Sequence, residues 1–108
     1  MNPQTVIIQR RTRQDDGIGG YDDVWASFLE VKGYLDMVNG TDLNGQQNAY
    51  IEQSTHMLII PDIPSAEITD KMRVAAEGKV YDITFVDDPV NVHHHLEVYL
   101  TFAGVEHG

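Results

Sequence analysis

The sequence contains no cysteine and few basic residues. Without cysteine, the chain can form neither a disulfide nor a Cys-ligated zinc site, and its composition fits a protein that is assembled in the cytoplasm. No apolar run is long enough to span a bilayer, and no basic-then-apolar signal opens the chain, so we expect no membrane partner. Hydrophobic residues still make up 42% of the chain, which is typical of a folded domain.

Basic side chains are outnumbered by acidic ones. Seven Lys and Arg stand against seventeen Asp and Glu, which gives a formal net charge of −10. Each phosphate contact of a nucleic-acid-binding protein needs a cation, so this balance argues against broad backbone contact, as in single-strand-binding barrels. The protein could still enclose DNA without gripping it. The alternative is that the charge serves solubility alone.

Catalytic motifs are missing as well: the chain has no GxSxG, no HExxH and no carboxylate pair in an apolar setting. The triple His93-His94-His95 is a metal-like signal, because His93 and His95 would share one face of a strand. A further ligand would have to come from elsewhere, such as His56 or Glu97. We predict no enzyme, no catalytic residue, no metal site and no cofactor. The alternative is a small metal-dependent hydrolase on a β-barrel that uses His93, His95 and His56.

Apolar and polar residues alternate over residues 79–102, which is typical of two strands with one buried face. The buried face would hold Tyr81, Ile83, Phe85, Leu96, Val98, Leu100 and Phe102. The opposite face would meet water or a partner with Asp82, Thr84, His95, Glu97 and Thr101. Residues 87–91 have the composition of a turn, so the segment predicts a long antiparallel hairpin.

The remaining apolar patterns predict further strands over residues 5–13, 24–35, 51–61 and 71–77. We expect Trp25 to be a core anchor. Residues 14–23 are rich in Gly and Asp and predict a mobile acidic loop. Residues 65–70 could form a short helical turn.

A long polar stretch, residues 36–50, interrupts the strands. It contains two Asn-Gly dipeptides and few residues that could pack, so we expect a flexible loop that acts together with a partner. In total, residues 1–108 predict a single all-β domain. Its architecture would be a small antiparallel β-barrel or sandwich of about six strands, with one long flexible loop and little helix.

The first predicted strand ends in basic residues, Arg10, Arg11 and Arg13. They are three of only seven basic residues in the chain. One interpretation is a solvated strand end whose charges prevent edge pairing. The other is a contact with an acidic surface of a partner protein.

The order of these features resembles the head-tail joining proteins of tailed bacteriophages, also called head completion or stopper proteins. The similar segments are the basic first strand, DDGIGGYDDVW, VKGYLD, STHMLIIP, GKVYDITFVDDP and HHHLEVYL. Within them, Thr55, His56, Gly78, Tyr81 and Ile83 occupy the positions that the family pattern expects. The resemblance covers nearly the whole chain and is greatest to the stopper of a siphophage that infects Gram-positive hosts.

The resemblance implies a small β-barrel that forms a dodecameric ring beneath the phage portal and its adaptor. We expect the free protein to be a monomer, because a chain of 12.1 kDa with a flexible loop suggests assembly induced by a partner. Such a ring closes the filled capsid, retains double-stranded DNA without sequence-specific binding, and later accepts a tail completion or tail-tube protein. The protein would be assembled in the host cytoplasm and reside in the virion at the head–tail interface.

The resemblance also implies roles for particular residues. The channel-closing loop would comprise Asn39, Gly40, Thr41, Asp42, Leu43, Asn44, Gly45, Gln46, Gln47 and Asn48. Arg10, Arg11 and Arg13 would dock on an acidic surface of the adaptor. The chain departs from many relatives at residues 93–95, where histidines replace a basic run, so an arginine-mediated contact at that position is not expected. The sequence leaves the role of the three histidines open.

Overall fold

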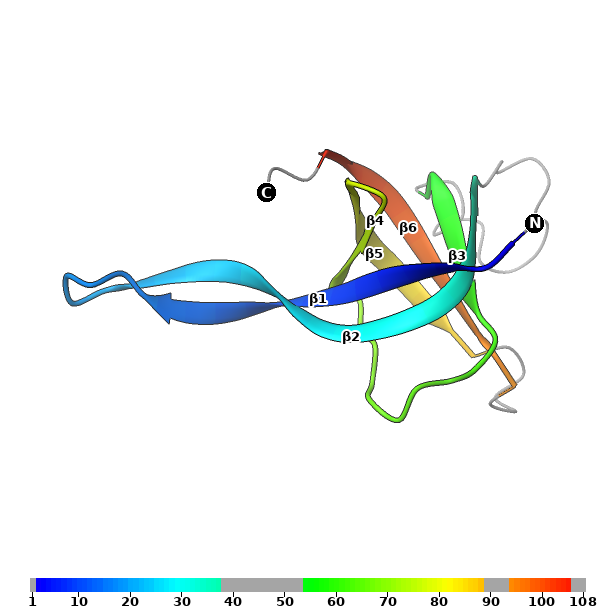
Figure 1. Ribbon diagram of the computed structural model, residues 1–108, viewed down its shortest axis with the longest axis horizontal. Helices are drawn as coiled ribbons and strands as arrows, with labels where there is room; N and C mark the ends of the chain where they lie inside the picture. The colour runs from blue at the N-terminus through cyan, green and yellow to red at the C-terminus, as the bar shows by residue number, and fades with distance from the viewer. Residues whose placement is uncertain (1, 38–53, 89–93, 106–108) are drawn as a thin grey trace.

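The computed structural model describes residues 2–37, 54–88 and 94–105. Six antiparallel strands form one sheet in the order β1-β2-β3-β6-β5-β4, and pairing of β1 with β4 closes the sheet into a barrel (Figure 1). The strands are β1 (Gln4–Asp15), β2 (Tyr21–Met37), β3 (His56–Ile60), β4 (Arg73–Ala76), β5 (Lys79–Asp87) and β6 (Leu96–Val105). The predicted small all-β antiparallel barrel is therefore confirmed.

Several predicted boundaries are wrong. The described residues contain no helix, and therefore no helix that could cross a membrane. In place of the helical turn expected over residues 65–70, the chain bends at residues 65–66 and makes a single turn at residues 70–71. Asp36 and Met37 belong to β2, so the strand reaches into the predicted loop at residues 36–50. β3 begins at His56, later than the predicted start at residue 51.

The barrel interior is filled by one side-chain set from each strand, as the period of two requires. Seven of its side chains are fully buried: Val6, Ile8, Leu58, Ile60, Val74, Val98 and Leu100. Phe28, Leu29, Leu35, Met72, Val86 and Leu96 pack against this cluster while remaining partly exposed. Burying each aliphatic side chain contributes about 1.5–3 kcal/mol, so the barrel is the stable part of the molecule.

A bulge in β5 changes which residues face the interior. Ile83 pairs with Leu100 and Phe85 pairs with Tyr99, which leaves Thr84 as the extra residue. The extra residue shifts the alternation by one position, so Val86 packs on the core and Phe85 contacts the Tyr99 ring at 5.9 Å. The expectation that Phe85 lies inside was therefore wrong.

Phe102 also departs from the predicted buried face, since 43% of its surface is exposed. A second bulge lies close to it, because the register shifts between Val80 and Tyr81. The Phe102 ring instead lies edge-on to that of Tyr81, with their centroids 5.7 Å apart.

Gly33 marks a close approach between β2 and β3. A Cβ atom at this position would lie 2.7 Å from the carbonyl oxygen of Ile59 and 2.8 Å from Cδ1 of Leu58. Backbone cannot withdraw from such a contact without shifting the strand. Glycine, which has no Cβ atom, is therefore the residue that allows β2 to approach β3 this closely.

Substitution of Gly33 tests this close approach. Gly33→Ala is expected to lower the free energy of unfolding by about 1–3 kcal/mol, because the methyl group overpacks the contact. Lys32→Ala, at an exposed position one residue earlier, is the matched control and should change stability little. Urea denaturation followed by tryptophan fluorescence measures both variants, and equal stability of Gly33→Ala and the wild type would disprove the clash.

Candidate functional site

The β1–β2 hairpin continues beyond the barrel as a two-stranded arm, which we define as residues 10–26 (Figure 1). β1 pairs with β4 only over residues 7–9, and β2 pairs with β3 only from Tyr34 onward. Residues 10–15 and residues 21–26 pair with each other. Six residue pairs at about 3.3 Å each give the arm a length of roughly 20 Å.

A bulge at Phe28 sets which side chains the arm presents outward. Ile8 pairs with Leu29 and Gln9 with Ser27, which leaves Phe28 as the extra residue. The alternation on β2 therefore changes phase between the barrel and the arm. As a result, Trp25 lies on the outer face and is only partly buried, so its predicted role as a core anchor was wrong.

Two guanidinium groups flank the Trp25 indole. The Arg11 guanidinium carbon lies 5.2 Å from the ring centroid and that of Arg73 lies 4.5 Å from it. Nε of Arg73 also donates a hydrogen bond of 2.6 Å to Oε1 of Gln9. Arg73 comes from β4, and the pairing of β4 with β1 brings it to the site. No local sequence motif predicts that pairing.

The other two predicted arginines are also stacked on aromatic rings. The Arg10 guanidinium lies 4.7 Å from the Phe28 centroid, and that of Arg13 lies 5.7 Å from the Tyr21 centroid. Such contacts contribute about 0.5–1 kcal/mol each at exposed sites and limit side-chain freedom. The structure thus brings all three predicted arginines onto the arm.

A groove lies beside Trp25 where the arm joins the barrel. It has a volume of about 460 Å³, and its lining residues are Arg11, Trp25, Asp70, Lys71, Met72 and Asp82. With the Arg73 guanidinium 4.5 Å from the indole centroid, three of the chain's seven basic residues meet here, around an apolar surface of Trp25 and Met72. We call this feature the Trp25 groove. The sequence analysis missed Lys71, Met72 and Arg73 as members of a site.

The tip of the arm, residues 15–23, is acidic and ordered by local hydrogen bonds. The backbone N–H groups of Ile18 and Gly20 each donate to Oδ1 of Asp16 at 2.9 Å. These two donors hold the pKa of Asp16 below its usual value. The predicted mobile loop is therefore a tight turn, with Asp15 and residues 21–23 inside the strands.

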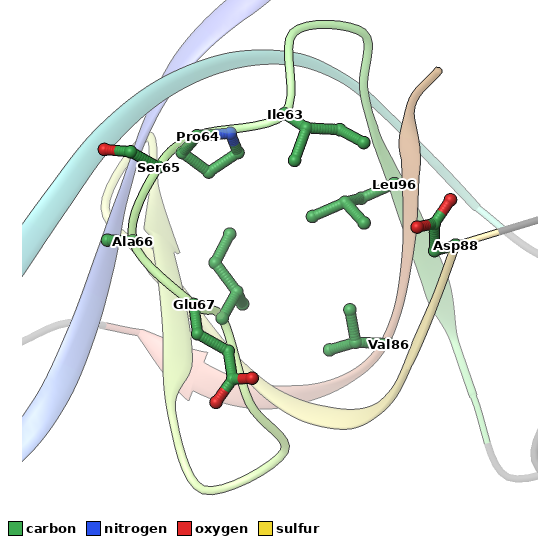
Figure 2. A pocket seen from close by; sticks show the side chains of 9 residues that line it. Ile63, Pro64, Ser65, Ala66, Glu67, Val86, Asp88 and Leu96 are labelled. Atoms are coloured by element: carbon green, nitrogen blue, oxygen red, sulfur yellow. The ribbon is translucent and has the colours of Figure 1, made fainter. Parts of the chain in front are cut away.

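A second cavity, of about 420 Å³, lies at one end of the barrel (Figure 2). Ile63, Val86 and Leu96 point into it, while Glu67 and Asp88 carry carboxylates on opposite sides. The remaining lining is Pro64, Ser65, Ala66 and Ile68. This largely apolar cavity has room for a side chain, and the hydroxyl of Ser65 points away from its centre (Figure 2).

The predicted channel-closing loop, residues 39–48, lies outside the described residues. The described strands on either side of it are adjacent, since Met37 of β2 pairs with His56 of β3. The chain positions that flank residues 38–53 are therefore neighbours in the sheet.

The histidines of the alternative hydrolase do not gather in one place. His56 pairs with Leu100, whereas His95 precedes Leu96 at the opposite end of the β3–β6 pair. His95 instead contacts Glu97, with Nε2 and Oε2 3.2 Å apart. His93 lies outside the described residues, and among those described no three His, Cys, Asp or Glu residues are placed to hold a metal ion.

His56 has a structural environment. Its ring lies edge-on to Tyr81 at 4.9 Å, and Nδ1 shares a 2.8 Å hydrogen bond with Oγ1 of Thr55. That Thr55 oxygen also accepts a 2.7 Å hydrogen bond from the backbone N–H of Phe102. Partial burial, reinforced by the charge of Lys79, lowers the pKa of His56 below its usual value.

The lowered pKa predicts a loss of stability in mild acid. The unfolded chain binds a proton at this histidine more readily than the folded chain, so protonation favours unfolding as the pH falls below about 6.5. His56→Gln should therefore lose less stability than the wild type between pH 7.5 and pH 5. Urea midpoints at the two pH values measure the difference, and identical losses in both proteins would contradict the prediction.

Comparison with known proteins finds one matching sequence family and a similar solved structure. A sequence family described as "Phage head completion protein" matches residues 3–101. A chain in the solved structure "Virion of native gene transfer agent (GTA) particle" is similar in fold, with a TM-score of 0.61 at 15% sequence identity. The similarity covers 94% of this chain and 96% of that one. No curated protein matches.

Proposed function

The chain belongs to the phage head completion protein family and is a structural component of the virion, and on this premise we propose that its copies form a ring beneath the portal and adaptor. The ring closes the DNA channel, retains the packaged genome and receives a tail completion or tail-tube protein. The observation that carries the proposal is the family match, which spans both the barrel and the whole arm. The siphophage and Gram-positive host remain a prediction.

The charge of the chain suits a channel through which DNA must pass. A ring of twelve copies multiplies a monomer charge of −10. An acidic wall repels phosphates, so DNA can slide past without being gripped. We propose that the free protein is a monomer and that assembly on the adaptor brings the copies together.

Docking to the adaptor is assigned to the arginines of the arm. The arm projects from the barrel (Figure 1), so Arg10, Arg11 and Arg13 can reach a neighbouring protein that the barrel itself does not touch. Stacking on aromatic rings holds their guanidinium groups in place, which reduces the entropy lost on binding. An acidic adaptor surface would supply the complementary charge.

Charge reversal on the arm tests the docking assignment. Arg10→Glu with Arg13→Glu should lower binding to capsids that carry portal and adaptor by at least about tenfold, because like charges would then face each other. Lys32→Glu with Lys79→Glu makes the same charge change at exposed positions on the barrel and serves as the control. Co-sedimentation with capsids measures binding. Equal binding of the two double variants would exclude the arm as the adaptor contact.

Channel closure is assigned to residues 39–48, on the sequence of this segment and its place between two adjacent strands. Deletion of residues 40–48 leaves seven residues, 38–39 and 49–53, to join Met37 to Ser54. The variant should therefore fold, with an unfolding transition close to that of the wild type, yet filled capsids that carry it should lose their DNA. Nuclease protection of packaged DNA measures retention.

Two controls make the deletion informative. Circular dichroism and thermal unfolding establish that the variant is folded, and gel analysis establishes that it is bound to capsids in normal amounts. Capsids that carry the folded variant and stay full would show that another segment closes the channel.

A further inference from the structure

The arm has opposite charges at its two ends. Near the barrel, Arg11, Lys71 and Arg73 surround Trp25, together with the carboxylates of Asp70 and Asp82. These residues include three of the chain's seven cations but only two of its seventeen acids, so this area is positive relative to the remaining surface. The tip carries four carboxylates, from Asp15, Asp16, Asp22 and Asp23.

The tip also carries an apolar side chain that the protein leaves in water. Ile18 is 89% exposed in the middle of the turn, and Tyr21, where β2 begins, is 68% exposed. Hydrogen bonds to Asp16 and Asp15 fix the turn, so Ile18 is presented on a rigid support. The Trp25 groove offers the complementary surface, since Met72 and the indole provide apolar contact between positive groups.

We propose that the arm tip of one copy binds in the Trp25 groove of the next copy, with Ile18 against Trp25 and Met72 and the tip aspartates beside Lys71 and Arg73. This contact joins two different surfaces, so it continues from copy to copy and closes as a ring when the rotation between copies permits. The inference rests on the proposed ring and names the contact that holds it together.

The dimensions of the molecule agree with this arrangement. The arm extends roughly 20 Å from the barrel, and the molecule measures 27 × 26 Å across its two short axes. An arm of this length crosses most of a neighbouring barrel. Within one chain, Ile18 lies beyond the Asp15–Tyr21 pair, which is four residue pairs, roughly 13 Å, from the Arg11–Trp25 pair, so a chain cannot place Ile18 in its own groove.

Cross-linking in assembled particles tests the contact directly. The natural chain has no cysteine, so a short bis-maleimide can join copies of this protein only through introduced thiols. Particles made with the double variant Ile18→Cys and Lys71→Cys should yield a ladder of covalent oligomers extending beyond the dimer on denaturing gels. Each single variant should yield none, because the two partner positions are different. Both sites are exposed, so folding should be preserved.

The outcomes separate the inference from the proposed function. A ladder in particles supports the tip-to-groove contact. Particles that contain the double variant in normal amounts but give no ladder, or give a cross-link to the adaptor or the tail protein, overturn this contact and leave the proposed ring intact. If the wild-type chain is absent from the head–tail junction, the proposed function and the inference fail together.

Charge exchange supplies a second, independent measurement. Asp22→Lys with Asp23→Lys should reduce incorporation into particles by about tenfold or more, since cations would then meet the basic groove. Adding Lys71→Glu and Arg73→Glu to the same chain should restore most of the incorporation. Glu30→Lys with Asp62→Lys, an equal charge change at exposed sites elsewhere, is the matched control and should incorporate normally. Failure of the four-residue exchange to recover incorporation, with the protein folded, would overturn the charge pairing.

Discussion

The register between β1 and β2 governs both parts of this molecule. In the barrel it places Val6 opposite Val31 and Ile8 opposite Leu29, which completes the interior. One extra residue, Phe28, then shifts the phase of β2, and the same pair of strands continues outward with Trp25 on its outer face. A single bulge thus allows one hairpin to contribute to a hydrophobic core and to an exposed site.

Alternating apolar residues were sufficient to predict the barrel, because burial on one face of a strand leaves a period of two in the sequence. The bulges at Phe28 and Thr84 were not predictable in this way. Each inserts one residue without changing composition, so Trp25 and Phe85 were assigned to the wrong face. The arm was not predicted, because Asp and Gly residues favour turns locally. In the structure the strands extend to Asp15 and Tyr21, and cross-strand stacking of Arg13 on Tyr21 stabilises this extension.

The arginines of the site were visible in the sequence, but their surroundings were not. Arg10, Arg11 and Arg13 are close together along the chain, and this concentration is conspicuous in so acidic a protein. Arg73 joins them only because β4 pairs with β1 and thereby closes the barrel, bringing residues 9 and 73 side by side. Such a contact depends on the register of strands distant in sequence, which composition and periodicity do not specify.

The arm has a further consequence for how the protein behaves before it assembles. In the described part of the chain, residues 10–15 and 21–33 pair on one side only, so hydrogen-bonding groups along both margins of a thin ribbon remain open. Exposed strand edges of this kind can pair with other copies of the chain and cause aggregation, which charged side chains suppress. Aspartate and arginine side chains along these margins therefore oppose pairing between free copies of the chain.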